Sequence, residues 1–514
     1  MASIESRRTL PALKVSQWLS DWDEIIYSPE TKRRKPDPHF FIFSIPAVEL
    51  RKLCGIHRRT ADLKVARDDN LGIQRQHDEE RSEEISRFVK FGFPWSTISE
   101  AKRSTDEYDD LRKPGWLPTS VVINIIPPGE KRFGSEVAPD DIVSIVETNG
   151  AFRVEMPYSD QAAEWSPTRL PPFEVIDGQH RLFAFSDDSN PDFELPVVAF
   201  VGLDISWQAY LFYTINIKPK KINPSLAYDL YPLLRTEDWL DKAEGHAVYR
   251  ETRSQELTES LWSHPQSPWR DRINMLGERG VTGATQSAWI NSLMASLVKP
   301  WKSRGSNTGG LFGSNLPGDD DVLGWSRAQQ AAFLICAWRE FFERVKSCSA
   351  DWAKDLRGEN DPLNNILGDL IENTEELPFF GKHSLINSDQ GVRGFLYVVN
   401  DVFFLSSIKW KLRSWQASEN AGAGDEIAVT AAINSLHQTE IPKLLSRLSD
   451  ALITFDWRSS SAPNLGEQER RAKLVFKGSG GYKELRVQLH EHLANSSDAE
   501  IASVSNDTLK IIKS

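Results

Sequence analysis

Runs of apolar residues in the first half of the chain predict a series of strands. Residues 38–50 (PHFFIFSIPAVEL) are rich in aromatic and β-branched side chains and predict a strand that leads into the start of a helix. The β-branched run at 119–126 ends at a Pro-Pro-Gly sequence, which is a stop signal for a strand. Shorter strands are expected at 141–147 and 151–156.

Strand and helix patterns then alternate up to about residue 215. A strand at 172–176 ends at an Asp-Gly corner, and a helix is expected to follow from about 179 to 186. A second strand at 195–201 precedes a helix at 206–215.

An amphipathic helix is expected earlier, at 73–91, because Ile85, Phe88 and Val89 recur at the i, i+3, i+4 spacing among charged residues. The alternation of strands and helices predicts a compact α/β or α+β domain over about 38–230. Residues 1–37 are then an N-terminal extension.

Long helical patterns replace the strands after about residue 235. They cover 285–297, 326–345, 428–451 and 482–493. A Gly/Ser/Asn/Asp-rich stretch at 302–321 is expected to be a loop or a mobile segment. Residues 235–514 are therefore expected to form a mostly helical domain that supports or regulates the N-terminal one, and the fold class of the whole chain is α+β.

Length and composition are those of a globular protein with more than one domain. The chain of 514 residues exceeds the roughly 250–300 residues that one hydrophobic core supports. Three scattered cysteines, Cys54, Cys336 and Cys348, are too few for a disulfide framework or a cysteine-based zinc site, which points to a reducing compartment and a cytoplasmic protein. No signal peptide is expected, because the start MASIESRRTL lacks an apolar core. No membrane segment is expected, because no apolar run approaches about 18 residues.

The net charge of −12 argues against a protein that coats nucleic acid without specificity, since such a protein needs a broad cationic face. Local basic clusters do occur. They lie at 31–35, 56–59 and 218–221, and such clusters are more often a solvated surface than a binding site.

The sequence Asp177-Gly178-Gln179-His180-Arg181 carries the most chemistry, because it stands at the expected strand-to-helix corner. A helix that begins there leaves backbone N–H groups pointing outward, and its dipole adds partial positive charge, so the corner attracts anions. Gly178 allows close approach of a ligand, Arg181 offers a planar fork for phosphate oxygens, and His180 adds a pH-dependent donor. Asp177 is a candidate to hold a metal-bound or attacking water. The alternative is an ordinary turn in which Asp177 caps the helix and Arg181 forms a salt bridge.

A second segment favours the phosphate interpretation. Asn216 stands near the end of the helix at 206–215, and Lys218, Lys220 and Lys221 follow on a turn marked by Pro219. Lysines on such a turn can approach a polyphosphate as point charges, and the amide of Asn216 can contact a phosphate-bound metal, a ribose or a base. A basic loop with a capping Asn is the alternative.

Four motifs in order resemble the DGQHR-domain family, whose members include DndB and DpdB of bacterial DNA-modification systems. The motif that names the family stands unaltered at 177–181. Gln74-Arg75 resembles the upstream Gln-Arg pair of the family, 117–125 (LPTSVVINI) its Pro-Thr-Ser strand, and 212–216 its Phe-x-x-x-Asn segment. The resemblance covers about 70–226, and in the helical half it extends only to GVRG at 391–394 and KGSGGYKEL at 477–485.

The wider resemblance is to the ParB/sulfiredoxin fold. Residues 178–184 are similar to the ParB phosphate box, and the spacing from Asn216 to Asn223-Pro224 matches a later ParB box. Pro219 stands where ParB has an arginine, so a cationic role there must fall to a neighbouring lysine. Gln179 stands where sulfiredoxin has its nucleophilic cysteine, which excludes that reductase chemistry.

The resemblance implies a nucleotide site. The triphosphate of ATP or CTP, with Mg²⁺, would face Gly178, Gln179, His180, Arg181 and Asn216. The same pocket would be approached by Gln74, Arg75, Lys218 and Lys220. Asp177, His180 and Arg181 would be the catalytic residues, since phosphoryl transfer needs mainly positioning and charge neutralisation. The chain would then be an NTP-binding and NTP-hydrolysing protein of a prokaryotic DNA-modification or anti-phage system, with DNA, other proteins of that system or further copies of itself as partners.

Two other functions compete with this one. A DndB-like transcriptional regulator would bind promoter DNA through a cationic face built from Arg33, Arg34, Lys35, Arg58 and Arg59. A ParB-like nuclease has less support, because no carboxylates cluster at the spacing of a two-metal site.

Two groups of possible metal ligands are interpreted as solvent-facing residues. Asp319, Asp320 and Asp321 lie in the Gly-rich stretch, where a solvated charge run is expected. His490 and His492 are two residues apart on a helix and point in different directions, so both are expected on the surface.

Overall fold

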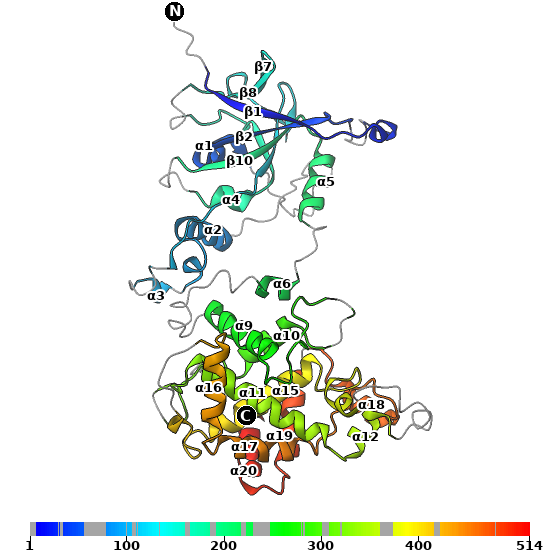
Figure 1. Ribbon diagram of the computed structural model, residues 1–514. Coiled ribbons are helices and arrows are strands. Elements are labelled where there is room, and N and C mark those ends of the chain that lie inside the picture. The colour runs from blue at the N-terminus through cyan, green and yellow to red at the C-terminus, as the bar shows by residue number, and fades with distance from the viewer. Residues whose placement is uncertain are drawn as a thin grey trace, which may run out of the picture. The chain divides into compact units, whose positions relative to one another are not determined.

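The computed structural model describes most of the chain, which forms two compact units, Met1–Lys221 and Ile222–Ser514 (Figure 1). The described residues are 7–28, 30, 34–55, 79–98, 100–104, 109, 111–132, 134–159, 165–185, 192–216, 223–229, 247–278, 280, 283–300, 308–318, 321–359, 374–415, 422–478 and 480–513.

An eight-stranded mixed sheet forms the centre of the first unit, with strand order β3-β9-β4-β10-β2-β1-β8-β7. The strands are β1 (Thr9–Ser16), β2 (His39–Pro46), β3 (Cys54–Gly55), β4 (Val121–Ile125), β7 (Ser144–Thr148), β8 (Ala151–Glu155), β9 (Phe173–Asp177) and β10 (Glu194–Val201). The pairs β4–β10 and β3–β9 are parallel and the other pairs are antiparallel. A separate small ribbon joins β5 (Lys131–Arg132) and β6 (Ser135–Glu136).

Helices cover the two faces of this sheet unequally. On one face, α1 (Ala47–Leu53), α2 (Glu79–Phe91) and α4 (Gln179–Phe183) pack their apolar side chains on the inward residues of β2, β4, β9 and β10. On the other face, α5 (Ile205–Asn216) packs Trp207, Leu211 and Phe212 around Val122 and Ile176. Shorter helices connect the remaining parts: η1 (Ser20–Glu24), η3 (Trp95–Thr97), α3 (Glu100–Arg103) and η5 (Pro139–Asp141).

The strands and helices expected between residues 38 and 215 are confirmed wherever the structure describes them. The elements follow in the expected order, which is β2, α1, β4, β7, β8, β9, α4, β10 and α5. The helix α2 occupies the described part of 73–91. A mixed sheet with helices followed by a helical region is consistent with the α+β class.

The first 37 residues differ from the expectation of an extension outside the domain. β1 lies inside the sheet, where it pairs with β2 on one side and β8 on the other. The physical reason is that the hairpin of β7 and β8 reaches the rest of the sheet only through β1. The segment TLPALKVS hides this role, because Pro11 and Lys14 interrupt its apolar pattern.

The second unit is helical. Its helices are α6 (Pro224–Asp229), α9 (Ala247–Ser263), α10 (Gln286–Ala295), α11 (Arg327–Lys346), α12 (Asp351–Arg357), α14 (Leu377–Phe380), α15 (Asp389–Leu405), α16 (Glu426–Leu436), α17 (Ile441–Leu452), α18 (Glu467–Leu474), α19 (Gly481–Leu493) and α20 (Ala499–Lys513), with η7 (Thr374–Glu376) and η8 (Leu412–Ser414). α11 is buried almost all round, and a capping box of Ser326 and Gln329 fixes its start. Trp338 of α11 packs ring against ring with Trp269 and Trp289.

Three features of this unit differ from the sequence expectation. The single helix expected at 428–451 is two helices, α16 and α17, because Pro442 stands in the first turn of α17 and cannot continue a helix. The boundary between the units falls between Lys221 and Ile222, and α6 packs on α9 and α10. The described part of the Gly-rich stretch is a loop, as expected, but from Thr308 to Phe312 this loop is buried.

Candidate functional site

The DGQHR corner is a strand–turn–helix junction with a left-handed glycine at its centre. Asp177 ends β9, Gly178 turns the chain with φ 95° and ψ 14°, and Gln179 begins α4. A side chain on residue 178 would place its Cβ 3.0 Å from Nη2 of Arg181 and 3.2 Å from Cα of Val121. Glycine is therefore required both by the turn and by the closeness of the arginine.

Arg181 is held at the corner by two partners. Its Nη2 donates to Oδ2 of Asp177 at 2.9 Å, and its Nη1 donates to the carbonyl oxygen of Thr119 at 2.9 Å and also to the Thr119 hydroxyl. Burial lowers the pKa of the Arg181 guanidinium, Asp177 opposes this shift, and the positive charge of Arg81 on α2 lowers the pKa again. The corner therefore has two arginines close enough to interact.

Asn216 reaches the same carboxylate from α5. Its Nδ2 donates to Oδ1 of Asp177 at 3.0 Å and to the carbonyl oxygen of Phe212, one turn earlier, at 3.1 Å. Both oxygens of Asp177 thus accept hydrogen bonds, one from Arg181 and one from Asn216. The structure brings together three segments that the sequence separates: the Pro-Thr-Ser strand through Thr119, the DGQHR motif, and the last turn of α5.

Gln179 and His180 occupy the first turn of α4. Gln179 is buried, and its Nε2 lies 3.4 Å from Nε2 of His180. Oε1 of Gln179 is buried as well and has no hydrogen bond among the described residues. A buried amide oxygen in this position is an acceptor that a ligand or water can satisfy.

A buried polar network that sequence reasoning missed fixes α5 against the sheet. Glu174 on β9 accepts from Asn124 at 2.8 Å, from Gln208 on α5 at 2.8 Å, and from Arg132 at 2.8 Å. Because these bonds satisfy both carboxylate oxygens, the network is structural, and it positions the helix that carries Asn216. Its sequence signal is a polar residue inside each of two otherwise apolar strands.

Several predicted site residues fall outside the part of the chain that the structure describes. These are Gln74, Arg75, Lys218, Pro219, Lys220 and Lys221 of the nucleotide prediction, and Arg33, Arg58 and Arg59 of the DNA-binding prediction.

The two described members of the predicted DNA-binding face are engaged in ion pairs. Arg34 pairs with Asp204 at 2.7 Å and with Glu130 at 3.1 Å. Lys35 pairs with Asp23 at 2.5 Å. Their charges are therefore compensated, which does not favour a cationic DNA-binding face at this position.

The prediction that His490 lies on the surface is wrong. His490 is fully buried on α19, and its Nε2 lies 3.1 Å from Oδ2 of Asp401, which also accepts two bonds from Arg486. His492 is half-buried and lies 2.6 Å from the Thr454 hydroxyl. The physical reason is that His490 belongs to the face of α19 formed by Leu485, Leu489 and Leu493, which packs on α15.

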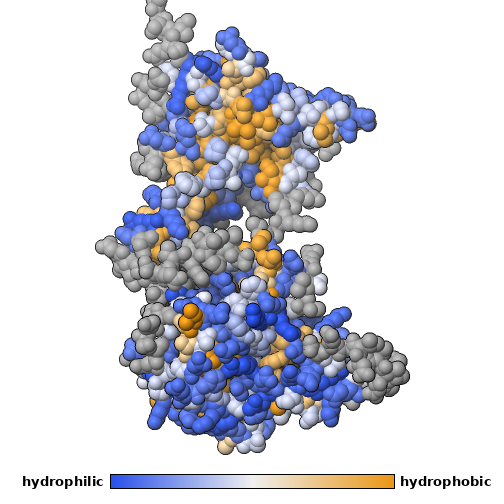
Figure 2. Space-filling model, viewed as in Figure 1, coloured by the Kyte–Doolittle hydropathy of each residue, from blue (hydrophilic) through white to orange (hydrophobic). Residues whose placement is uncertain are grey.

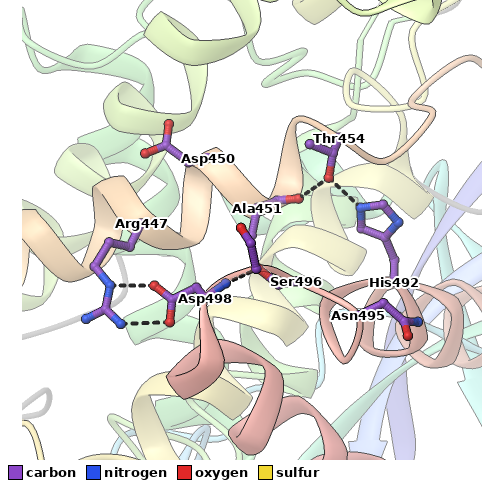
Figure 3. Close-up of a pocket in the computed structure, with 9 residues that line it drawn as sticks. Arg447, Asp450, Ala451, Thr454, His492, Asn495, Ser496 and Asp498 are labelled. Carbon is purple, nitrogen blue, oxygen red and sulfur yellow. Dashed lines mark hydrogen bonds and ion pairs between the residues drawn. The ribbon is translucent and has the colours of Figure 1, made fainter.

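The polar pocket in the helical unit has little charge left for a ligand (Figure 3). It has a volume of about 450 Å³ and lies between α17 and the turn before α20. Figure 3 shows Arg447 pointing at Asp498, which it contacts at 2.6 and 2.7 Å, and Asp450 pairs with Arg344 at 2.6 Å. Thr454 lies between the Ala451 carbonyl and His492, whose pKa is lowered by burial. The charged groups of this pocket are paired with one another or with α11, so the pocket is a weak candidate for a charged ligand.

Within the described residues, no group of three or more His, Cys, Asp or Glu side chains is placed to hold a metal ion, and no helix is long and apolar enough to cross a membrane. The described Asp321 is exposed.

No protein-family model, curated protein or solved structure matches this chain. The candidate site therefore rests on its own geometry.

Proposed function

We propose that the chain is a nucleotide-binding protein with a ParB/sulfiredoxin-like N-terminal domain, and that the DGQHR corner holds the phosphates of a nucleoside triphosphate. The observation that carries the proposal is the joining of Thr119, Asp177, Arg181 and Asn216, from separate segments, at one left-handed glycine. The resemblance to the DGQHR-domain family supports a role in a prokaryotic DNA-modification or anti-phage system.

The hydrogen bonds of Arg181 fit a phosphate ligand. Asp177 and Thr119 fix the guanidinium in one orientation, which removes most of the rotamer entropy that a free arginine would lose on binding. The positive charge of Arg81 lowers the pKa of Arg181, so a phosphate bound at Arg181 would be attracted by both arginines.

Asp177 fits a positioning role better than a metal-binding one. Its two oxygens accept from Arg181 and Asn216, so it links α4 to α5 instead of offering a free carboxylate. With no cluster of metal-ligating side chains among the described residues, Mg²⁺ would be held mainly by the phosphates and by water, as is common for this ion. The chemistry that Mg²⁺ supplies is neutralisation of phosphate charge.

The test is calorimetric titration of the protein with ATP, CTP and GTP in the presence of Mg²⁺. We expect binding of at least one nucleotide and its loss in Arg181→Ala, because a hydrogen-bonded charge contact to phosphate is worth about 1.5–3 kcal/mol, or roughly 10–150-fold in affinity. Arg153→Ala is the matched control, since Arg153 is an exposed arginine on β8 and its removal changes the net charge equally. Absence of binding by the unchanged protein, or an equal loss in both variants, would contradict the proposal.

Hydrolysis is a separate question with its own measurement. Release of inorganic phosphate by the unchanged protein, lost in Arg181→Ala and in His180→Ala, would place the corner in an NTPase. Binding without phosphate release would leave a nucleotide-binding protein that is not an enzyme.

A further inference from the structure

An exposed tryptophan stands in the segment that leads to the DGQHR corner. Trp116 lies between α3 and β4 and is 76 % exposed, and no hydrogen bond or ring contact joins its indole to another described residue. Figure 2 shows apolar side chains of this unit gathered over the sheet and along α5, whereas Trp116 belongs to neither of these. A single exposed apolar residue is common on a protein surface, so only its surroundings indicate a role.

The backbone on both sides of Trp116 is fixed. Gly115 is buried, and a Cβ at this position would overlap the carbonyl group of Phe88 on α2. The backbone N–H of Lys113 donates to the carbonyl oxygen of the last residue of α2 at 2.9 Å. Leu117 packs against the hydrophobic core of the sheet. An ordered stretch of chain therefore holds the indole in solvent, although exposed apolar surface is unfavourable in water.

The same stretch of chain continues into the candidate site. The carbonyl oxygen of Thr119 accepts from Nη1 of Arg181 at 2.9 Å, and the Thr119 hydroxyl accepts from the same nitrogen. Thr119 follows Trp116 by three residues, and three extended residues span at most about 11 Å. The indole is thus attached close to the arginine on which the proposed phosphate site depends.

Helix α2 gives a second measure of this separation. Arg81, near its start, is close enough to Arg181 to lower the pKa of that guanidinium. Phe88, which lies against the residue before Trp116, follows Arg81 by two turns, or about 10 Å along the helix axis. Both routes are consistent with a separation of about 10 Å between the backbone of Trp116 and Arg181. An extended nucleoside triphosphate spans such a distance between its phosphates and its base.

The chemistry of the indole fits the base of such a ligand. Its π-face is wide, flat and apolar, and every nucleobase has a π-face that can stack on it. A ligand that joins an anionic group to a flat neutral ring therefore matches the guanidinium of Arg181 and the indole of Trp116 together. An inorganic polyphosphate would use the arginine alone.

We propose that Trp116 is the platform on which the base of a nucleotide stacks while its phosphates lie at the DGQHR corner. This inference rests on the proposed nucleotide-binding function and adds the side chain that recognises the nucleoside. Stacking distinguishes the four bases weakly, because each of them has a π-face. The indole therefore separates nucleotides from other polyphosphates more strongly than it separates one base from another.

The test compares a nucleotide with inorganic tripolyphosphate, which has the phosphates but no base. The unchanged protein, Trp116→Ala and Arg181→Ala are titrated by calorimetry with each ligand and Mg²⁺, and the nucleotide is whichever of ATP, CTP and GTP the unchanged protein binds most tightly. We expect Trp116→Ala to weaken nucleotide binding about fivefold or more, which is the size of one base–aromatic contact, and to leave tripolyphosphate binding unchanged. Arg181→Ala should weaken the binding of both ligands.

Two further variants serve as controls. Trp116→Phe keeps an aromatic face and should retain most of the affinity for the nucleotide. Leu13→Ala removes another exposed apolar side chain, which is 65 % exposed on β1, and should change the binding of neither ligand. Because the indole of Trp116 is mostly in solvent, Trp116→Ala should keep the melting temperature of the unchanged protein, so that lost affinity does not reflect lost folding.

Tryptophan fluorescence gives a direct signal of stacking, because a base stacked on an indole quenches its emission. We expect the nucleotide to quench part of the emission of the unchanged protein and tripolyphosphate to quench none of it. Trp116→Phe should bind the nucleotide without this quenching. Quenching that persists in full in Trp116→Phe would place the base elsewhere and overturn the inference.

The outcomes separate this inference from the proposed function. Absence of binding of every nucleotide and of tripolyphosphate by the unchanged protein would contradict the proposed function and, with it, the role of Trp116. Equal affinity of the unchanged protein and Trp116→Ala for the nucleotide would overturn this inference alone. An equal loss of nucleotide and tripolyphosphate binding in Trp116→Ala would overturn it too, because the tryptophan would then act on the phosphate site and not on the base.

Discussion

At the scale of single residues, the partners of a buried charged side chain decide its pKa and its structural role. Asp401 on α15 is fully buried, and burial alone would raise the pKa of its carboxyl. The contacts with Arg486 and His490 outweigh burial and lower that pKa to about 2. Arg486 donates to both oxygens at 2.7 Å and also to the Thr308 hydroxyl at 2.9 Å. The ion pair of Arg486 and Asp401 thus connects α19 and α15, and the bond to Thr308 connects both helices to the Gly-rich stretch.

Asp401→Asn should lower the free energy of unfolding of the helical unit by about 3–5 kcal/mol, because it leaves Arg486 buried without a counter-charge. Glu440→Gln is the control, since Glu440 pairs with Lys443 on the surface and its loss should cost less than about 1 kcal/mol. Chemical denaturation of both variants measures the difference.

The pH dependence of this difference follows from the sign of the shift. The pKa of Asp401 is lower in the folded protein than in the unfolded chain. Its carboxylate therefore contributes fully to the free energy of unfolding above the unfolded pKa of about 4, and this contribution is lost as the pH falls towards about 2. The gap in stability between the unchanged protein and Asp401→Asn should therefore narrow over that range. A gap that stays constant from pH 5 to pH 2 would show that the charge of Asp401 is not responsible.

At the scale of elements, glycine content predicted the loop at 302–321 but not the burial of its described part. Its described part includes Gly309 and Gly310, which lie in the core. The Gly310 N–H donates to the Lys299 carbonyl oxygen at 2.9 Å, and Asn400 on α15 bonds to the backbone on both sides of it. A side chain at residue 310 would place its Cβ 2.5 Å from the Leu297 carbonyl oxygen. These glycines therefore permit close packing instead of mobility.

Gly310→Ala should lower the free energy of unfolding by about 1–3 kcal/mol, the usual cost of overpacking a core. Gly324→Ala is the matched control, because a Cβ there would meet nothing within 4 Å. Thermal unfolding measures the melting temperatures of the two variants, and we expect that of Gly310→Ala to be the lower. Equal melting temperatures would mean that the segment can move aside, as a loop would.

Elements with strong local patterns were predictable, and those defined by distant partners were not. β4, β9 and β10 carry runs rich in β-branched and other apolar residues, so their sequences alone indicate strands that pack in a core. β1 escaped prediction because its place depends on β2 and β8. The break between α16 and α17 carries a local signal in Pro442, which the long apolar pattern outweighed.

In the candidate site, too, local features were predictable from the sequence and contacts between distant segments were not. The corner at Gly178 follows from its own residues. A salt bridge of Arg181 was part of the alternative interpretation, but its partner, Asp177, was expected to cap the helix instead. The bond from Asn216 to Asp177 and the bond from Arg181 to Thr119 depend on the sheet order and could not be read from local sequence.

At the scale of the whole molecule, each unit has a hydrophobic core of its own. The core of the sheet unit is drawn from residues between Leu10 and Ala199, and that of the helical unit from residues between Leu257 and Ile501. Separate cores of this size are characteristic of separate folding domains.

Scanning calorimetry should therefore show two transitions. Phe43→Ala, which removes a ring that is 4 % exposed from the sheet core, should lower one transition, and Gly310→Ala should lower the other. A single transition that both variants lower equally would indicate one cooperative unit.

The position of β10 also sets the order in which a nascent chain can complete its sheet. β10 lies between β4 and β2 and is the sole link between the group β3, β9, β4 and the group β2, β1, β8, β7. It is the last strand of the sheet to leave the ribosome, so until Val201 has been synthesised the two groups cannot join. During that interval the edges of β2 and β4 that β10 later covers have no partner strand, and such open edges favour aggregation of a nascent chain.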